Sequence, residues 1–460
     1  MDHKPNILFI MCDQLRADAL GCTGGWVKTP NIDRLAREGA RFSNCVTTSP
    51  VCVPARISMA TGRYPHNTEI WTNRQSELPK GTPTWMSAIR DAGYRTSLFG
   101  KSALHRGRNL RRFEYLLKSY GLDDVDEIRG PRASAGTPCR MTARWKSLGL
   151  LASFRKDIEQ RSGKNKTLVR PSPLPLAEYY DVYVGQQAKK YLRCYKRSQP
   201  WFCWVSFAGP HEPWDCPEPF ASMHRVEEMP GPFKRPPVRD SGPSGELDRR
   251  FAESPEGEIP NAKELRANYA GKVTLIDDQI GQILNEIEKR GEFDRTIILF
   301  TSDHGEMNGD YDLIYKSNFL NGAVRVPLIV STPEIRKSNR GETIIESFVE
   351  WFDAGPTLAD LAGARINHTQ FARSLVPVLE NPKIEHRRFA ISELSLELMY
   401  LDHDWKLLLN RKGEAYRLFN VKKDPREMED LIGRDQYEGL IKELKSNVLD
   451  RWMQTQEMQG

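Results

Sequence analysis

The stretch "RTIILFTSDHGE", residues 295–306, joins an unbroken apolar run to a polar cluster. A strand that is apolar on both faces is typical of a parallel sheet covered by helices, so we expect a buried strand at 295–302. The cluster that follows contains Asp303 and His304, whose side chain types bind cations and transfer protons, and Glu306, which we interpret as structural. The stretch therefore predicts an α/β fold with chemistry at the end of a strand.

Three further apolar runs end in the same way. They are "NILFIM" (6–11) before Cys12-Asp13-Gln14, "YRTSLFG" (94–100) before Lys101 and His105, and "WFCWVSFAG" (201–209) before Pro210-His211-Glu212. In open α/β sheets, ligands bind beyond the carboxyl ends of the strands. We therefore expect all four polar clusters to meet at one edge of the sheet, although Asp13 and Asp303 are nearly 300 residues apart in sequence.

Helices are predicted between these strands. The segment "TPNIDRLAREG" (29–39) has Thr29 as an expected N-cap and Gly39 as an expected stop. A longer amphipathic run at 261–290 precedes the strand at 295–302, as in a β-α-β unit. The run "DDQIGQ" (277–282) within it is interpreted as helix surface and not as a second metal site.

The segments 120–180 and 226–262 are rich in Pro, Gly, Ser and charged residues, and we expect loops or insertions there. After about residue 370 the pattern changes to short strands, "HRRFAISEL" and "WKLLLN", followed by a polar helix. We therefore expect a large, mainly parallel α/β domain flanked by helices at 1–370. A smaller C-terminal α+β domain, with short antiparallel strands and a terminal helix, is expected at 371–460.

Composition excludes several classes of protein. The 460 residues contain 67 Lys and Arg against 61 Asp and Glu, a net charge of only +6, and no nucleic-acid motif accompanies the basic segments. The apolar runs are too short to span a membrane. The N-terminus shows no cleavage site of a secretion signal, so we expect a cytoplasmic protein, or a periplasmic or secreted one if a leader has been removed. We expect no nucleic-acid or membrane partner.

Asp13, Asp303 and His304, with Gln14 through its amide oxygen, form a candidate metal site. These ligands are mostly oxygens with one imidazole, which suits Ca²⁺, Mg²⁺ or Mn²⁺ better than a structural zinc. An Asp after a strand also commonly caps the next helix. The presence of two such strand ends favours the metal site.

Cys52 lies in "SPVCVPARISMATGRYP" (49–65), where a helix is expected to begin. The free N–H groups and the dipole of a helix start favour an anion, including a thiolate. A lone cysteine is also commonly a buried structural residue. The residues alone leave three alternatives open: a structural cysteine, a thiol nucleophile, or the precursor of another group.

The pattern Cys-x-Pro-x-Arg followed by "TGRYP" resembles the signature of the sulfatases, in the alkaline-phosphatase-like superfamily. The resemblance extends over nearly the whole chain, from "PNILFIMCDQLRADALGC" (5–22) through "TIILFTSDHGEMNGD" (296–310) to "YRLFNVKKDPREMEDLI" (416–432). It implies that a maturation enzyme oxidises Cys52 to formylglycine. The hydrated aldehyde, a gem-diol, would be both the nucleophile and a metal ligand.

The resemblance also implies a ligand set, in which Asp13, Asp303 and the gem-diol of residue 52 bind one divalent cation. Gln14 stands where many sulfatases have Asp, and His304 where many have Asn. Both replacements resemble the branch of choline sulfatases and phosphonate monoester hydrolases. They lower the negative charge around the metal, which favours manganese more than in most sulfatases. Calcium is still expected first, with manganese and magnesium as alternatives.

Further catalytic residues follow from the resemblance. Arg56 would hold the gem-diol. Lys101, His211 and Lys316 would bind the sulfate oxygens, and His211 or Lys316 would protonate the leaving alcohol. This arrangement places positive charge where the anionic oxygens of a sulfate ester must be neutralised before attack.

Two other positions match the family less closely. His105 would assist the gem-diol, but it follows Lys101 by four residues, whereas the common spacing in the family is two. Asn73, in "WTNRQ" (71–75), stands where the choline-sulfatase branch has an Asn that faces the sulfate.

We therefore expect a sulfatase that converts an anionic sulfate monoester to an alcohol and sulfate. The alternative is a phosphonate monoester or phosphodiester hydrolase with the same nucleophile, because the two anions share tetrahedral geometry. A non-catalytic binding protein is disfavoured, since Asp13, Cys52, Arg56 and Asp303 are all present. The basic run "HRGRNLRR" (105–112) beside Lys101 favours a polyanionic substrate.

Overall fold

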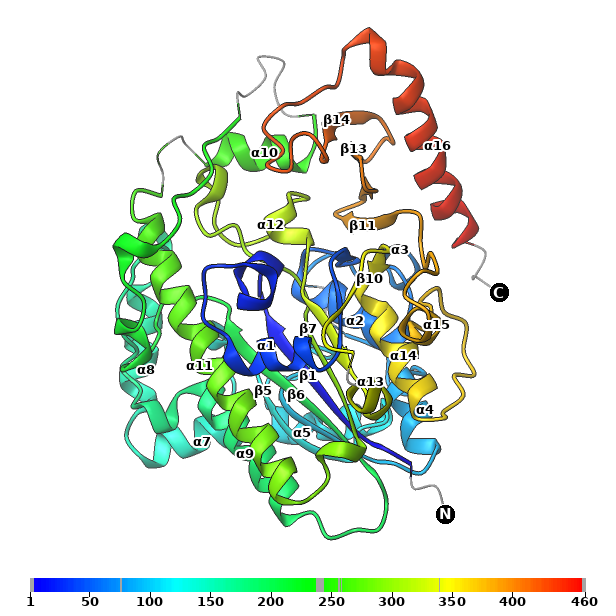
Figure 1. Ribbon diagram of the computed structural model, residues 1–460. Coiled ribbons are helices and arrows are strands. Elements are labelled where there is room, and N and C mark those ends of the chain that lie inside the picture. Colours follow the sequence, from blue (N-terminus) through cyan, green and yellow to red (C-terminus); the bar gives the residue numbers. More distant parts are fainter. Residues whose placement is uncertain are drawn as a thin grey trace.

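The computed structural model describes residues 4–74, 77–236, 244–254, 257, 259–338 and 340–456. Its centre is an eight-stranded sheet with the order β5-β4-β6-β1-β7-β8-β2-β9 (Figure 1). These strands are β1 (Asn6–Asp13), β2 (Ala40–Phe42), β4 (Arg95–Lys101), β5 (Asp124–Ile128), β6 (Trp201–Pro210), β7 (Thr296–Ser302), β8 (Leu328–Ser331) and β9 (Thr343–Ile345). A separate pair is formed by β3 (Cys45–Val46) and β10 (Val349–Glu350).

The first five strands in this order, from β5 to β7, all run parallel. β8 is antiparallel to both of its neighbours, and β2 pairs in parallel with β9. All residues of β1, β6 and β7 are buried, as their unbroken apolar sequences predicted. The expected mainly parallel sheet is confirmed, and the four predicted strands end within two residues of their expected positions.

Helices cover both faces of the sheet, and β1 shows how its side chains are divided between them. Ile7, Phe9 and Met11 belong to one core cluster, with residues of α2, α4, α5 and α14. The alternate residues of β1 belong to the second cluster, with residues of α1, α9 and α11 (Figure 1). The helices are α1 (Pro30–Arg37), α2 (Cys52–Thr61), α3 (Pro65–Thr68), α4 (Trp85–Asp91), α5 (Leu110–Ser119), α6 (Pro131–Ser134), α7 (Arg140–Ser147), α8 (Leu151–Gln160), α9 (Tyr180–Cys194), α10 (Glu246–Glu253), α11 (Ala262–Lys289), α12 (Asn321–Val324), α13 (Pro333–Ser338), α14 (Ala354–Leu361), α15 (Val376–Glu380) and α16 (Glu438–Gln454).

The two predicted helices are present as α1 and α11, but α1 begins by a different mechanism from the one expected. The Thr29 side chain makes no capping hydrogen bond. The carboxylate of Asp277 on α11 accepts the backbone N–H of Ile32 at 2.8 Å and of Asn31 at 3.1 Å instead. Asp277 is buried, and burial raises its pKa to about 6. The interpretation of 277–282 as helix surface was therefore wrong for Asp277, and also for Gln279 and Ile280, which are buried too.

The expectation of loops at 120–180 was also wrong, because β5, α6, α7 and α8 lie there. Trp145 of α7 and Phe154 of α8 are fully buried and pack against each other with ring centroids 4.8 Å apart. Each of these helices has only a few apolar residues among many polar and charged ones, so composition alone indicated a loop. Part of the second expected loop is α10; residues 237–243, 255, 256 and 258 lie outside the described residues.

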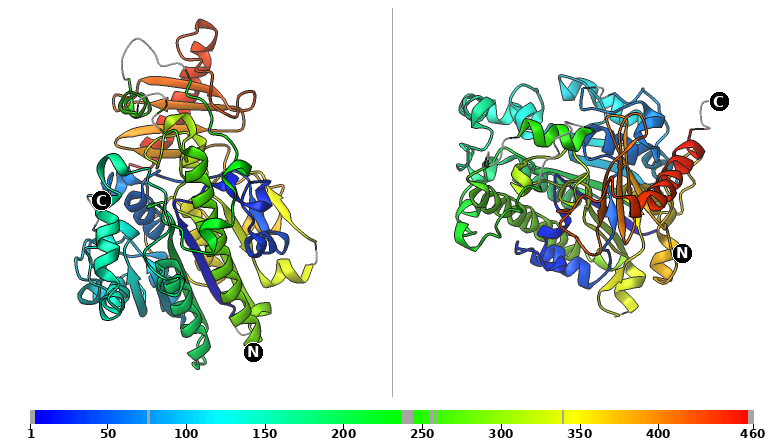
Figure 2. Two further views of the ribbon diagram at one scale, coloured as in Figure 1. Left: turned by 90° about the vertical axis from the view of Figure 1, so that its left-hand side faces the viewer. Right: turned by 90° about the horizontal axis from the view of Figure 1, so that it is seen from above.

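The C-terminal part contains a second sheet with four antiparallel strands (Figure 2). The strands are β11 (Ala390–Leu394), β12 (Glu397–Leu401), β13 (Trp405–Leu409) and β14 (Ala415–Asn420), and α16 packs against the last three. The expected α+β character is confirmed, whereas the boundary at residue 370 stays a prediction. The backbone N–H of Glu393 in β11 donates to Thr48 O at 2.9 Å, so this sheet supports the segment that leads to Cys52.

None of the described helices combines the length and the hydropathy needed to cross a membrane.

Gly100 occupies the point where β4 lies closest to β6. Its φ of +114° is unfavourable for other residues, and a Cβ there would lie 1.9 Å from Ser206 O. Gly93 has a similar φ of +97° but no atom within 4 Å of its would-be Cβ. We expect Gly100→Ala to lower the free energy of unfolding by about 2–3 kcal/mol more than Gly93→Ala, because the backbone of β6 cannot yield without strain. Equal urea midpoints for the two variants would contradict this packing.

Candidate active site

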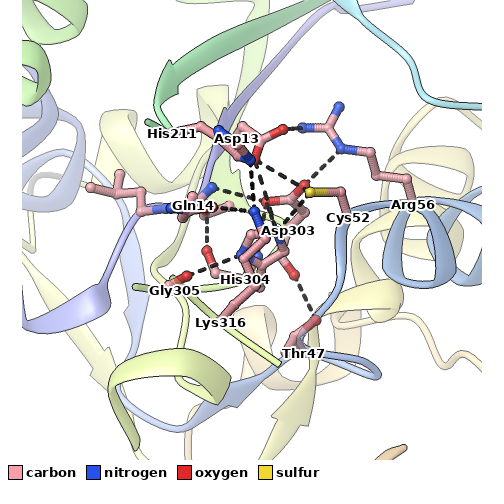
Figure 3. Close-up of polar contacts among 12 residues, drawn as sticks. Asp13, Gln14, Thr47, Cys52, Arg56, His211, Asp303, His304, Gly305 and Lys316 are labelled. Atoms are coloured by element: carbon pink, nitrogen blue, oxygen red, sulfur yellow. Dashed lines mark hydrogen bonds and ion pairs between the residues drawn. The ribbon is translucent and has the colours of Figure 1, made fainter. Parts of the chain in front are cut away.

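The four strand ends meet at one edge of the sheet, as expected. The backbone N–H of Gln14, after β1, donates to Asp303 Oδ1, after β7, at 3.1 Å. Lys101, the last residue of β4, forms an ion pair with Asp13. The N–H of His211, after β6, donates to Asp13 O at 3.1 Å. Residues distant in sequence thus form one buried polar cluster (Figure 3).

Four of these side chains form a candidate metal centre. Asp13, Cys52, Asp303 and His304 each offer one donor atom, and the four atoms lie within 4.8 Å of one another. Cys52 Sγ is 3.1 Å from His304 Nε2 and 3.7 Å from Asp13 Oδ1. His304 Nδ1 lies 3.0 Å from Gly305 O. Since a carbonyl can only accept, Nδ1 carries the proton and the lone pair of Nε2 faces the cluster.

Arg56 of α2 fixes the outer oxygens of both carboxylates. Its Nε donates to Asp303 Oδ2 at 2.7 Å and its Nη2 to Asp13 Oδ2 at 3.1 Å (Figure 3). All three side chains are completely buried. Arg56 was expected to hold the group at position 52. Its other hydrogen bonds go to Lys101 O and Ser206 Oγ, so within the described chain it holds the two candidate metal-binding carboxylates and the end of β4, and its expected role at position 52 stays a prediction.

Cys52 is the first residue of α2 and is 2% exposed. Burial and the charge of Asp13 raise the pKa of its thiol, but the ammonium groups of Lys101 and Lys316 contribute to an opposing effect that outweighs them, so the pKa lies well below its usual value. Position 52 therefore favours an anionic group. Behind it, the N–H of Val53 donates to Asn73 Oδ1 at 3.0 Å, so Asn73 fixes the first turn of the helix.

Gln14 has an unusual backbone conformation, with φ of +70°, which turns its side chain between opposite charges. Its Oε1 accepts a hydrogen bond from Lys316. Its Nε2 donates to Glu212 Oε2 at 3.1 Å and also to Glu306. The amide oxygen is thus engaged by Lys316, and the expected role of Gln14 as a metal ligand stays a prediction.

His211 and Lys316 are placed together at the centre of the site. Lys316 Nζ lies 2.7 Å from His211 Nε2, and His211 Nδ1 lies 3.0 Å from Glu212 Oε2. Burial lowers the pKa of His211, but Glu212 and Asp13 raise it, to about 9 on balance. Since two N–H donors cannot hydrogen-bond to each other at 2.7 Å, Lys316 Nζ and His211 Nε2 share one proton in this geometry, and the pair can bind an oxyanion or donate that proton.

His105 is buried nearby and both of its ring nitrogens are occupied. Its Nδ1 accepts the N–H of Gly107 at 3.0 Å, so Nε2 carries the proton and donates to Glu127 Oε2 at 2.7 Å. Within the described chain no hydrogen bond joins His105 to Cys52. His105 lines the same cavity as Cys52, and its catalytic role stays a prediction.

Three acidic residues of this region were not predicted as site residues. Glu127 holds His105, Glu212 holds His211 and Gln14, and Glu306 holds Gln14. Glu212 and Glu306 directly belong to the strand-end clusters, so their positions were visible in the sequence. Glu127 ends no polar cluster of its own, and only the pairing of β4 with β5 brings it to the site.

Cys52, Asn73, Lys101, His105 and His211 line one open cavity of about 760 Å³. It provides access from the solvent to the group at position 52. The site thus combines a candidate metal centre, an anion-favouring position and several cations at the base of a cavity of small-molecule size.

Comparison with known proteins identifies this combination. Residues 5–364 match the model of the family described as Sulfatase. The chain belongs to the sulfatase family. Residues 309–454 also match the model of the N-sulphoglucosamine sulphohydrolase C-terminal region. The resemblance inferred from the motifs is confirmed, and the protein is an enzyme of the sulfuric ester hydrolase class, not a non-catalytic binding protein.

Relatives of several specificities share nearly the whole chain of this sulfatase. An arylsulfatase from Clostridium perfringens is 28% identical over 96% of this chain and 93% of its own. A choline-sulfatase from Rhizobium meliloti is 27% identical over 93% and 82%, respectively. The structure of a phosphonate monoester hydrolase from Agrobacterium radiobacter superposes with a TM-score of 0.78, at 23% identity over 98% and 96%. This last similarity shows that the fold is shared.

We expect Arg56→Gln to weaken metal binding about 10- to 100-fold, because Asp13 and Asp303 lose the group that orients them. The loss also leaves buried carboxylates without compensation, so the variant is expected to be less stable by about 3–5 kcal/mol. Calorimetric titration of folded, metal-free protein with Ca²⁺ and Mn²⁺ measures the first effect. Arg56→Lys is the matched control: it keeps the charge but cannot contact both carboxylates, so its affinity should be intermediate. Unchanged affinity in Arg56→Gln would contradict the clamp.

We expect Glu127→Gln to lower the free energy of unfolding by about 1–3 kcal/mol near neutral pH, and by less in acid. Burial raises the pKa of the Glu127 carboxyl, but Arg129 and His105 lower it by more than burial raises it. The folded-state pKa is therefore below the usual value. The contribution of Glu127 is therefore present above its unfolded pKa, about 4.3, and is lost as the pH falls through the folded pKa.

Urea unfolding of both proteins between pH 3 and 7 measures this difference. Glu288→Gln is a suitable control, because Glu288 is 37% exposed in its ion pair with Arg34 and should change stability by at most about 0.5 kcal/mol. A difference for Glu127→Gln that does not vary with pH would contradict the assignment.

Proposed function

We propose that this enzyme hydrolyses sulfate monoesters with a formylglycine derived from Cys52 and one divalent cation. The observation that carries the proposal is the position of Cys52, whose Sγ lies 3.1 Å from His304 Nε2 within the cluster that includes Asp13 and Asp303. A structural cysteine would not need three ionisable neighbours, and a simple thiol nucleophile would not need two carboxylates beside it.

The residues present fit a divalent cation. Two carboxylates and one imidazole are suitable ligands for Ca²⁺, Mn²⁺ or Mg²⁺, and we propose Asp13, Asp303 and His304 as ligands together with the group at position 52. Calcium is proposed first, because oxygen donors predominate; the imidazole makes manganese the main alternative. A bound cation would neutralise oxyanion charge and favour deprotonation of a hydroxyl group.

The chain itself supplies the cations that a sulfate ester requires. Three cations lie near position 52 and can bind the non-bridging oxygens of the ester. They are Lys101 at the end of β4, His211 after β6, and Lys316 in the segment that follows β7. His211 Nε2 lies 2.7 Å from Lys316 Nζ, with Glu212 behind its Nδ1, so either His211 or Lys316 is suited to give the proton that the two share to the leaving alcohol. Arg56 holds Asp13 and Asp303 in position and does not contact the ester in this scheme.

The burial of Cys52 has a consequence for maturation. At 2% exposure, the side chain is not accessible to a second enzyme in the folded protein. We therefore propose that a formylglycine-generating enzyme acts on Cys52 before the chain has folded. On folding, the modified residue 52 then becomes the first residue of α2, and Val53 and Pro54 continue the first turn of the helix.

Phosphonate monoester or phosphodiester hydrolysis is the second candidate function. Gln14 favours it, because an amide at this position leaves the site less negative than a third carboxylate would. The two reactions share a tetrahedral anionic centre, so the same cations can serve both. Turnover of an aryl sulfate and of an aryl phosphonate monoester by the same preparation distinguishes them.

We expect Cys52 to be an aldehyde, or its hydrate, in protein produced together with a formylglycine-generating enzyme. Trypsin releases residues 42–56, "FSNCVTTSPVCVPAR", which contain both Cys45 and Cys52. Cys45 is equally buried and is the internal control: after alkylation, fragment masses should show a modified thiol at 45 and an aldehyde at 52.

The same preparation should hydrolyse the aryl sulfate, and Cys52→Ala should abolish the activity. A thiol at position 52 in fully active protein would refute the formylglycine mechanism. An aldehyde at position 52 combined with turnover of only the phosphonate would replace the first candidate function by the second.

A further inference from the structure

The cavity in front of Cys52 is strongly basic beyond the residues proposed for the sulfate. Five arginines line it: Arg74, Arg106, Arg108, Arg129 and Arg132. Among the described residues that line the cavity there is no carboxylate and no Phe, Tyr or Trp. A cavity lined by charges of one sign concentrates the field and attracts ions of the opposite sign.

Two of these arginines are held by the protein. Arg129 Nη2 donates to His105 O at 2.6 Å and to Gly107 O at 3.1 Å, so it fixes the loop after β4. Arg132 donates to Arg161 O at 3.3 Å, and its Nε lies 3.8 Å from Glu212 Oε1. Structural contacts therefore account for the presence of both side chains.

The other three arginines have no such explanation. The side chains of Arg74, Arg106 and Arg108 are exposed and form no hydrogen bond or ion pair with any residue in the described ranges. Arg106 and Arg108 come from the loop between β4 and α5, and Arg74 comes from the segment after α3. Two separate segments thus direct unpaired cations toward one cavity, where they repel one another unless an anion binds.

The unpaired arginines Arg74, Arg106 and Arg108 form a basic wall of the cavity. A single sulfate monoester does not supply enough negative charge to balance this wall. The ester group carries one charge, and Lys101, His211 and Lys316 already surround its proposed position. We propose that the substrate carries at least one further oxyanion, a sulfate or a carboxylate, and that Arg74, Arg106 and Arg108 bind it. The planar guanidinium forms paired hydrogen bonds with either group. This inference rests on the proposed sulfatase function and names its substrate class.

The same wall disfavours two other substrate classes. A quaternary ammonium group, as in choline sulfate, is recognised by aromatic faces and is repelled by unpaired arginines. An aryl group would find no Phe, Tyr or Trp ring to stack on within the described lining. The volume of about 760 Å³ is within the range for small-molecule sites and accepts a sugar-sized scaffold. The structure thus assigns a polyanionic, sugar-like sulfate ester to this cavity.

A matched pair of esters tests the second anionic group. N-acetylglucosamine 6-sulfate has one anionic group, and glucosamine 2-N,6-O-disulfate has two on the same scaffold. We expect kcat/KM of the mature enzyme to be at least about tenfold higher for the disulfate at low salt, since charge-assisted hydrogen bonds have this order of effect. The preference should decline at high ionic strength. A glucosamine 6-sulfate linked to a hexuronic acid tests a carboxylate as the second group.

Arginine variants locate the effect. Arg106→Gln and Arg108→Gln should each reduce the ratio of kcat/KM between disulfate and monosulfate by about tenfold. Arg112→Gln is the control, because Arg112 is equally exposed on the adjoining α5 but does not line the cavity, and it should leave the ratio unchanged. Equal kcat/KM for the two esters, or equal loss in all three variants, would overturn the proposal.

Binding separates this inference from the proposed function. Calorimetric titration of Cys52→Ala with the same two esters needs no turnover, and we expect about tenfold tighter binding of the disulfate. If the aldehyde-containing enzyme hydrolyses aryl sulfate but binds both esters equally, or binds neither, the inference fails and the sulfatase function stands. If the disulfate binds more tightly but no sulfate ester is hydrolysed, the proposed function fails and the second anion site stands.

Discussion

The burial of two carboxylates side by side is the constraint on which the site depends. Asp13 and Asp303 are both completely buried at the edge of the sheet, where each charge raises the cost of the other. Arg56 compensates them through hydrogen bonds to one oxygen of each, and Lys101 adds an ion pair to Asp13. Because these groups come from β1, β4, β7 and α2, the compensation requires the sheet and the helix to be assembled.

The charged residues of the site are arranged in two layers. In the inner layer, carboxylates and cations are paired and buried, and the geometry is fixed by direct contacts among Asp13, Arg56 and Asp303. In the outer layer, which lines the cavity, cations predominate and several have no partner within the described chain. A bound anion is stabilised most at the junction of the layers, where water is partly excluded and the fixed cations need no rearrangement. Position 52 lies at this junction.

The sequence predicted the sheet and the location of the site for one physical reason: unbroken apolar strands must be buried, and their polar ends must meet at one edge. It failed where a side chain's partner depends on tertiary contacts. Thr29 has the residue type of an N-cap, but Asp277, from a helix almost 250 residues later, caps α1. The helices between 140 and 160 have few apolar residues, and Trp145 becomes decisive only through its packing on Phe154. Likewise, the sequence identified Arg56, Asp13 and Asp303 as site residues, but not the hydrogen bonds that join them.

Gln14 illustrates how such partners determine residue type. Its side chain lies between the ammonium group of Lys316 and the carboxylates of Glu212 and Glu306. A carboxylate at this position could accept a hydrogen bond from Lys316. It could not donate one to Glu212 or Glu306, and its charge would be repelled by both buried carboxylates. An amide accepts on one side and donates on the other, so it satisfies both neighbours at once. The presence of Gln at position 14 therefore follows from Glu212 and Glu306, and it holds Lys316 beside His211 at the centre of the site.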